Sequence, residues 1–185
     1  PYQRFRPSRR SSSKPISEQT QRSLASLLAE AAAVEGPIHR DVLFRLIARL
    51  LDSRLTQSAV AALEAALGAA EEESRLTRRG DFIWPAGMTA PPLRWRAVED
   101  AVTDPDHIAP EEAAAAAAWV VQHEFGVPEA DLPAAVVRAM GLRRVTEPNL
   151  RLARAGVEFA LATGLIAKDE RGLMTTPPRP PSPAA

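Results

Sequence analysis

The chain repeats itself at a spacing of 90 residues. A shift of 90 positions, made without a gap, brings identical residues together: Gly36 and Gly126, Asp41 and Asp131, Arg54 and Arg144, and Thr56 and Thr146. The apolar residues at positions 42, 46, 47, 50, 55, 60 and 67 also meet apolar partners. A repeat of this length predicts two structural units with one common element order, so the fold must fit twice into 185 residues.

Each copy has the pattern of three helices. In the first copy, apolar residues recur at helical spacing over residues 18–34, 41–51 and 57–73. The corresponding ranges in the second copy are 110–124, 129–140 and 146–163. Thr56 and Thr146 stand where a side-chain oxygen would cap the third helix of each copy.

A hairpin is predicted after each third helix. The stretch "SRLTRRGDFIWPAG" has two short apolar strands around Gly80, and "GLIAKDERGLM" has Gly172 in its turn. We expect one aromatic of Phe82 and Trp84 to pack on its unit, with the neighbouring arginines exposed. The order helix, helix, helix, hairpin predicts a mainly α fold with small β-hairpins, built from tandem winged-helix (winged helix-turn-helix) repeats.

These elements predict five parts. Residues 1–17 form a basic flexible arm or linker, 18–87 the first winged-helix unit, 88–107 a linker, 108–175 the second winged-helix unit, and 176–185 a disordered Pro-rich tail. Residues 1–22 carry six basic residues and one acidic residue, although the whole chain has no net charge. Such an arm is either a solvated linker or a contact for phosphates.

Composition limits the class of protein. The chain has no cysteine, which excludes disulfides, thiolate catalysis and zinc-thiolate sites and favours a reducing compartment. It has no run of about 18 apolar residues, so we expect no membrane association and a cytoplasmic location. The first residues have no apolar signal-peptide core, and we interpret the chain as a fragment of a longer protein.

The histidine two positions before Asp41 raises the question of a catalytic or metal-binding pair. Under the repeat, Asp41 aligns with another acid, whereas His39 aligns with Glu129. An acid in the first turn of a helix offsets the partial positive charge there. This effect explains the acid in both copies without a catalytic or metal-binding role. His107 and His123 lack metal-ligand spacing, and no phosphate-binding or nucleophile motif is present. We therefore predict no enzymatic activity, no metal site and no cofactor.

Four stretches resemble a known family: "VEGPIHRDVLFRLIARL", "RRGDFIWPAG", "PPLRW" and "HIAPEEAAAA". They look like the C-terminal domain of unknown function of large bacterial DNA-helicase-related proteins of the superfamily I helicase/nuclease type. The resemblance covers residues 30–173. It implies a setting in DNA processing or phage defence and upstream helicase and nuclease domains as partners. The chain departs from the family at residues 51–53, where an aromatic or glycine-containing helix end is common, so the turn that follows is expected to differ.

DNA binding is the first function that this pattern predicts. In winged helices the third helix commonly enters the major groove and the wing contacts the backbone, so basic residues there are candidates for nucleic-acid contact. The candidates in the second copy are Arg143, Arg144, Asn149, Arg151 and Arg154, with Lys168 and Arg171 on the wing. Those in the first copy are Arg54, Gln57, Arg75, Arg78 and Arg79. The acids at positions 64 and 71–73 make the first copy the poorer candidate.

Protein docking or dimerisation is the alternative function. The body of the chain is mildly acidic, and alanine-rich faces over residues 57–73 and 111–121 permit close helix approach. The sequence does not separate the two functions. In either case we expect a non-catalytic accessory module.

Overall fold

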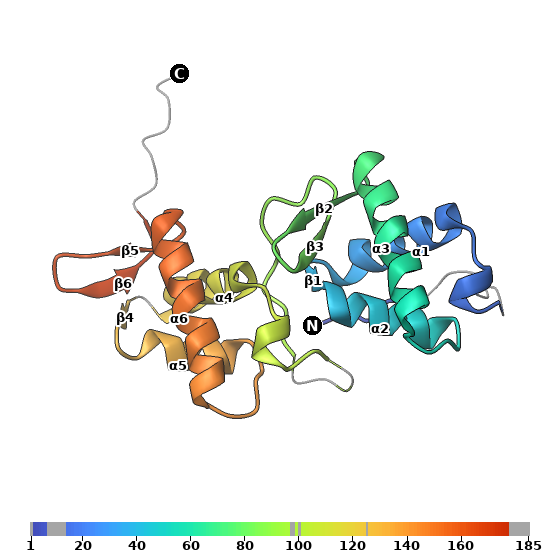
Figure 1. Ribbon diagram of the computed structural model, residues 1–185. Helices are drawn as coiled ribbons and strands as arrows, with labels where there is room; N and C mark the ends of the chain where they lie inside the picture. Colours follow the sequence, from blue (N-terminus) through green and yellow to red (C-terminus); the bar gives the residue numbers. More distant parts are fainter. Residues whose placement is uncertain (1, 7–13, 97–98, 100, 125, 178–185) are drawn as a thin grey trace, which may run out of the picture. The chain divides into compact units, whose positions relative to one another are not determined.

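The computed structural model describes residues 2–6, 14–96, 99, 101–124 and 126–177 (Figure 1). The chain divides into two compact units, residues 2–89 and residues 90–185. Each unit has its own hydrophobic core and its own three-stranded antiparallel sheet. The predicted mainly α fold with small β-hairpins is confirmed. Within the described residues, no helix is both long enough and apolar enough to cross a membrane.

The first unit runs helix, strand, helix, helix, strand, strand after a short 3-10 turn. Its elements are η1 (Ile16–Glu18), α1 (Gln21–Glu35), β1 (Ile38–His39), α2 (Arg40–Leu50), α3 (Gln57–Glu72), β2 (Leu76–Arg79) and β3 (Phe82–Pro85). The sheet order is β1-β3-β2, with Ile38 opposite Ile83 and Leu76 opposite Pro85. The predicted hairpin around Gly80 is therefore present, and β1 adds a third strand to it.

The second unit repeats this order. Its elements are η2 (Pro105–His107), α4 (Pro110–Glu124), β4 (Val127–Pro128), α5 (Leu132–Ala139), α6 (Glu147–Ala162), β5 (Ala167–Lys168) and β6 (Leu173–Thr175). The sheet order is β4-β6-β5, which matches that of the first unit. In Figure 1 the β5–β6 hairpin begins near the C-terminal end of α6 and extends away from the helix.

Apolar side chains at helical spacing fill the first core. Those that are fully or almost fully buried come from all three long helices and from β3: Leu24, Leu28, Ala31, Leu43, Ile47, Leu63, Leu67 and Ile83. Side chains three or four positions apart share one helix face, so this set follows directly from the sequence pattern.

Small residues let two helices of the second unit approach closely. A Cβ atom added to Gly156 of α6 would lie 2.4 Å from the Cβ of Ala113 in α4. Ala113, Ala114, Ala116 and Ala117 are all completely buried. The alanine-rich face of residues 111–121, considered above as a surface for a partner, is therefore mostly interior to its own unit.

Three helix starts show how local chemistry sets the boundaries. Thr56 accepts a hydrogen bond from the Ala59 N–H (3.2 Å), which confirms the predicted cap of α3. Thr146 precedes α6, but its hydroxyl makes no capping hydrogen bond. Pro148 lies in the first turn of α6 and has no N–H to donate. Helix α5 begins at Leu132 rather than at residue 129, because Pro133 fits only the first turn of a helix.

His39 is the N-cap of α2. Its Nδ1 accepts a hydrogen bond from the Asp41 N–H at 3.2 Å, and Asp41 lies in the first turn. The structural interpretation of this pair is confirmed.

The arm predicted over residues 1–17 is in part folded onto the first unit. Tyr2, Phe5 and Ile16 are buried, and Ile16 is only 1% exposed. Glu35, the last residue of α1, accepts hydrogen bonds from the Tyr2 hydroxyl (2.5 Å) and the Phe5 N–H (2.8 Å). Residues 7–13 of the predicted arm and residues 178–185 of the predicted tail lie outside the described residues.

The aromatic residues of the first hairpin behave differently from the arginines. Trp84 is 1% exposed and Phe82 is half-buried, while Arg78 and Arg79 are exposed, as expected. Ile83 is also fully buried, so both faces of β3 are covered. Strand alternation alone predicted one covered face.

Candidate nucleic-acid interface

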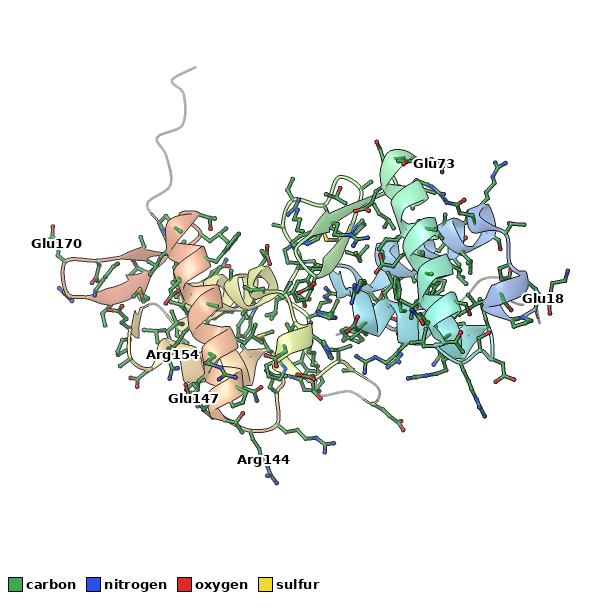
Figure 2. All side chains as sticks on the ribbon, viewed as in Figure 1. Glu18, Glu73, Arg144, Glu147, Arg154 and Glu170 are labelled. Carbon is green, nitrogen blue, oxygen red and sulfur yellow. The ribbon has the colours of Figure 1, made fainter. Side chains whose placement is uncertain are left out.

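Basic side chains are concentrated where α5 leads into α6. Residues 138–154, which we name the basic segment, contain five arginines and one glutamate, a net charge of +4. The five are Arg138, Arg143, Arg144, Arg151 and Arg154, and all are exposed. Figure 2 shows Arg144 projecting from the loop before α6, and Arg154 beside Glu147 on one side of the helix.

Most of these arginines have no acidic partner. Within the described part of the chain, the side chains of Arg143, Arg144 and Arg151 form no salt bridge and no hydrogen bond. Arg154 pairs with Glu147, with Nη1–Oε1 and Nη2–Oε2 distances of 2.8 and 3.5 Å. The hydrogen bond and the charge of Arg154 hold the pKa of Glu147 below its usual range, and the same contacts raise the pKa of Arg154. Both groups of this pair are therefore charged at neutral pH.

Asn149 does not face outward, contrary to the prediction. Its side chain is largely buried, and its Nδ2 donates a hydrogen bond to the carbonyl oxygen of Arg144 at 2.7 Å. Asparagine at this position ties the loop to the helix, because the amide satisfies a backbone acceptor that the turn leaves open. Asn149 therefore positions the arginine loop, and its side chain is far less exposed than those of the neighbouring arginines.

The second hairpin adds little net charge. Lys168 forms a salt bridge with Glu129 at 2.5 Å. Arg171 is exposed at the turn, where the Asp169 carboxylate accepts the N–H groups of Arg171 and Leu173. Residues 168–171 contain two basic and two acidic residues. The hairpin therefore carries its cations together with an equal number of acids.

The first unit has the same helices but a different charge pattern. Helices α3 and α6 are both 16 residues long and start 90 positions apart. The positions of Arg151 and Arg154 are occupied by Ala61 and Glu64. Residues 48–64 match the basic segment under the 90-residue shift, and they carry two basic and two acidic residues.

Arginines around Glu64 are neutralised within the first unit. Arg40 Nη1 and Arg78 Nη2 each lie 3.1 Å from one oxygen of Glu64. Arg40 also pairs with Asp41 at 2.9 Å, and Arg78 Nε lies 3.5 Å from Glu71. We name this series, Asp41 to Arg40 to Glu64 to Arg78 to Glu71, the ion-pair chain. The predicted candidate Arg78 is one of its members.

The remaining candidates of the first unit are either engaged by other groups of that unit or exposed without an acidic partner. Arg79 lies over the Trp84 ring, 4.1 Å from its centroid, and donates to the Met88 carbonyl oxygen. Arg75 pairs with Glu73 and donates to Ser26. Arg54 and Gln57 are exposed, and Arg54 forms no salt bridge within the described residues. Among the described residues, two predicted arginines of this unit, Arg54 and Arg79, therefore have no acidic partner, and of these Arg79 is engaged by Trp84 and Met88.

The second unit has a buried charge cluster that the sequence reasoning did not predict. Arg94 donates to both carboxylate oxygens of Glu112, at 3.0 and 2.8 Å, and Arg96 donates to the same carboxylate. All three side chains are almost fully buried. The alternation in "LRWR" is the signal: it places both arginines on one side of an extended segment and leaves Trp95 exposed on the other.

Among the described residues, no three His, Cys, Asp or Glu side chains gather as metal ligands. His107 lies 3.4 Å from Asp104, and the His123 ring is stacked on Trp119 with the ring centroids 4.2 Å apart. The described residues also include the exposed arginines of the basic segment, from the end of α5 into α6.

Comparisons with models of protein families, with curated proteins and with solved structures gave no match to the chain. The functional interpretation therefore depends on the residues and their geometry.

Proposed function

We propose that this chain is a non-catalytic tandem winged-helix module that binds duplex DNA through its second unit. The shared order of helix, strand, helix, helix, strand, strand supports the winged-helix assignment. In such domains the third long helix and the turn before it approach the major groove. Helix α6 and the loop that holds Arg143 and Arg144 are the corresponding parts here.

The observation that carries the proposal is the set of exposed arginines without acidic partners in the basic segment. The second unit as a whole has 10 basic and 13 acidic residues, so its net charge is −3. Charges are screened over about 8 Å at physiological salt, so a phosphate held at the basic segment responds mainly to its +4. Local charge therefore outweighs the net charge of the unit in this contact.

A salt titration of duplex binding tests the proposal. We compare the full chain with a triple variant in which Arg143, Arg144 and Arg151 are replaced by Ala. Each phosphate contact contributes about 0.9 to the slope of log K against log salt, so removing three should flatten the slope by up to about 2.7. Melting temperature should be nearly unchanged, since the three side chains are exposed.

A matched control removes the same charge from the first unit. Arg22, Arg49 and Arg54 are exposed and form no salt bridge among the described residues. Replacing all three by Ala should change the salt slope by much less than the first triple variant does. Equal effects of the two triple variants, or no duplex binding by the intact chain at low salt, would overturn the proposal.

We further propose that the module is an accessory part of a helicase/nuclease-type DNA-processing protein of the bacterial cytoplasm. This part of the proposal is supported by the sequence resemblance over residues 30–173. The upstream helicase and nuclease domains of such a parent protein would supply the catalysis.

Protein docking is the second candidate function, and Trp119 favours it. This side chain is 44% exposed on α4, and its ring is stacked on His123. Exposed tryptophans often anchor protein interfaces, because they bury a large apolar area on binding. A docking role predicts that Trp119→Ala weakens association with the upstream domains of the parent protein and leaves duplex affinity unchanged.

A further inference from the structure

One stripe of α6 carries both hydrogen-bond donors and acceptors. Glu147, Arg151, Arg154 and Glu158 are spaced by four, three and four residues, so they lie on one face of the helix. All four are exposed. The Glu147–Arg154 ion pair on this stripe has no net charge, so the pair adds little attraction for phosphates. The chemistry of the pair suits the edges of bases better than the DNA backbone.

Arg154 is held in place on this stripe. Both terminal nitrogens of its guanidinium face the Glu147 carboxylate, at 2.8 and 3.5 Å (Figure 2). A guanidinium has five N–H donors, so this contact leaves donors available for a second acceptor. A side chain that is already ordered loses less conformational freedom when it binds. Arg154 is therefore prepared for a directional contact in a way that a free surface arginine is not.

We infer that Arg154, positioned by Glu147, reads a guanine in the major groove, so that the second unit prefers particular duplex sequences that contain a G·C pair. This inference rests on the proposed function. Bidentate donation from arginine to guanine is the commonest specific contact between side chains and bases. Glu147 acts as a positioning residue, because it orients Arg154 and does not itself need to contact the base.

The first unit lacks these groups at the same positions. The residues that match the stripe are Gln57, Ala61, Glu64 and Gly68. Alanine and glycine side chains have no donors or acceptors, and Glu64 is held by Arg40 and Arg78. We therefore expect one recognised half-site for each chain, not two.

The test begins with selection of preferred duplexes from a randomised library by the full chain. Affinity is then measured for the preferred duplex and for duplexes in which each G·C pair is replaced by A·T. One bidentate contact is expected to give roughly 5- to 150-fold discrimination at a single pair. Arg154→Lys keeps the charge but loses the planar fork, so it should lower this ratio and largely retain affinity for unrelated duplexes.

Glu147→Gln separates base reading from simple electrostatics. Removing a negative charge should raise the affinity for every duplex, and this happens under either interpretation. If Arg154 reads a base, the discrimination ratio should also fall, because Arg154 is no longer positioned by the Glu147 carboxylate. Simple electrostatics does not predict this fall. Glu158→Gln is the matched control: it makes the same charge change on the same helix, and Glu158 forms no salt bridge among the described residues. It should keep the ratio of the unchanged chain.

The outcomes distinguish this inference from the proposed function. Duplex binding without sequence preference, or a ratio that survives in both Glu147→Gln and Arg154→Lys, overturns the base-reading role and leaves the proposed function standing. No duplex binding at low salt overturns both. Loss of the ratio in Glu147→Gln and Arg154→Lys, but not in Glu158→Gln, supports the inference.

Discussion

The hydrogen atom that serves as the side chain of Gly156 determines how closely α6 approaches α4. A methyl group there would meet Ala113 Cβ at 2.4 Å and Ala114 N at 2.8 Å. Backbone atoms cannot rotate away as a long side chain can, so the two helices would have to separate.

We expect Gly156→Ala to destabilise the protein by about 1 to 3 kcal/mol, the usual cost of overpacking. Gly68→Ala is the control, because a Cβ there meets nothing within 4 Å. Alanine is favoured over glycine in a helix by up to about 1 kcal/mol, so this variant should be more stable. Chemical denaturation measures both. A neutral or stabilising Gly156→Ala would contradict the close contact.

Asp41 provides a test that depends on pH. Partial burial raises the pKa of its carboxyl, but the hydrogen bond and charge of Arg40 outweigh that effect and leave the pKa below its ordinary value of 3.8. A carboxyl with a lowered folded-state pKa stabilises the protein fully above its unfolded value, and this contribution disappears as pH falls through the folded value.

The contribution should therefore disappear only below about pH 4. The side chain is 48% exposed, so we expect less than about 1 kcal/mol. Carboxyl-detected NMR titration measures the value directly. A measured pKa at or above 3.8 for Asp41 would show that the contact with Arg40 does not persist in solution.

Single residues differ in how far their roles could be predicted from sequence. Thr56 was predictable as a cap, because the capping hydrogen bond reaches a nearby N–H along the chain. Asn149 was not, because its side chain could point to solvent or to a carbonyl of the preceding loop, and only the folded turn decides. The pairing of Glu64 with arginines from α2 and β2 is also invisible in sequence, since its partners lie 24 and 14 positions away.

At the level of elements, the extended segment that contains Arg94 and Arg96 belongs to the second unit. It lies within residues 88–107, which the sequence predicts as a linker. Both arginines are instead buried against Glu112 in the first turn of α4. Charged groups are removed from water here, and each depends on the others for compensation.

Removing the shared carboxylate should therefore be costly. We expect Glu112→Gln to destabilise the protein by about 3 to 5 kcal/mol, because two buried guanidinium groups lose their counter-charge. Glu111→Gln makes the same change one residue earlier, at a partly exposed position with no salt bridge among the described residues. Its effect should be within about 0.5 kcal/mol. Thermal unfolding of both variants measures the difference, and similar melting temperatures would refute the role of the cluster.

Long helices were easier to predict than short strands. The bounds of α3 and α6 agree with the expected ranges to within about one residue, since 16 residues of apolar periodicity give a strong signal. Strands β1 and β4 have two residues each and were missed, because two residues show no alternation. The late start of α5 could have been predicted from Pro133.

For the whole molecule, the repeat predicts a shared architecture but not a shared surface. The first unit has a net charge of +3 and the second −3, yet residues 138–154 of the second carry five arginines and one acid, whereas the matching residues 48–64 of the first carry two basic and two acidic residues. The sequence places the arginines of the second unit correctly near α6. It does not show that Arg78 and Lys168 are engaged by acids, because those pairings cross from one element to another.

Releasing the neutralised arginines of the first unit should add a binding surface. We expect Glu64→Gln to strengthen duplex binding and steepen the salt slope, because Arg40 and Arg78 each lose one acidic partner. The change should be smaller than the roughly 1.8 of two fully free phosphate contacts, since Arg40 keeps Asp41 and Arg78 keeps Glu71. Glu30→Gln is the control, since Glu30 is exposed and forms no salt bridge among the described residues. The same salt titration applies, and equal slopes for the two variants would count against this role of Glu64.

The two hairpins should also differ in the free energy of local opening. Strands β2 and β3 pair at four positions, and the ion-pair chain ties β2 to α3. Strands β5 and β6 pair at only two positions, and the salt bridge from Lys168 to Glu129 is exposed. Fewer pairings lower the free energy of local opening, so backbone amides of residues 167–175 should exchange with deuterium faster than those of residues 76–85. The second hairpin can then change its conformation when it contacts a bound surface. The first hairpin is held in one conformation by its strand pairings and by the ion-pair chain.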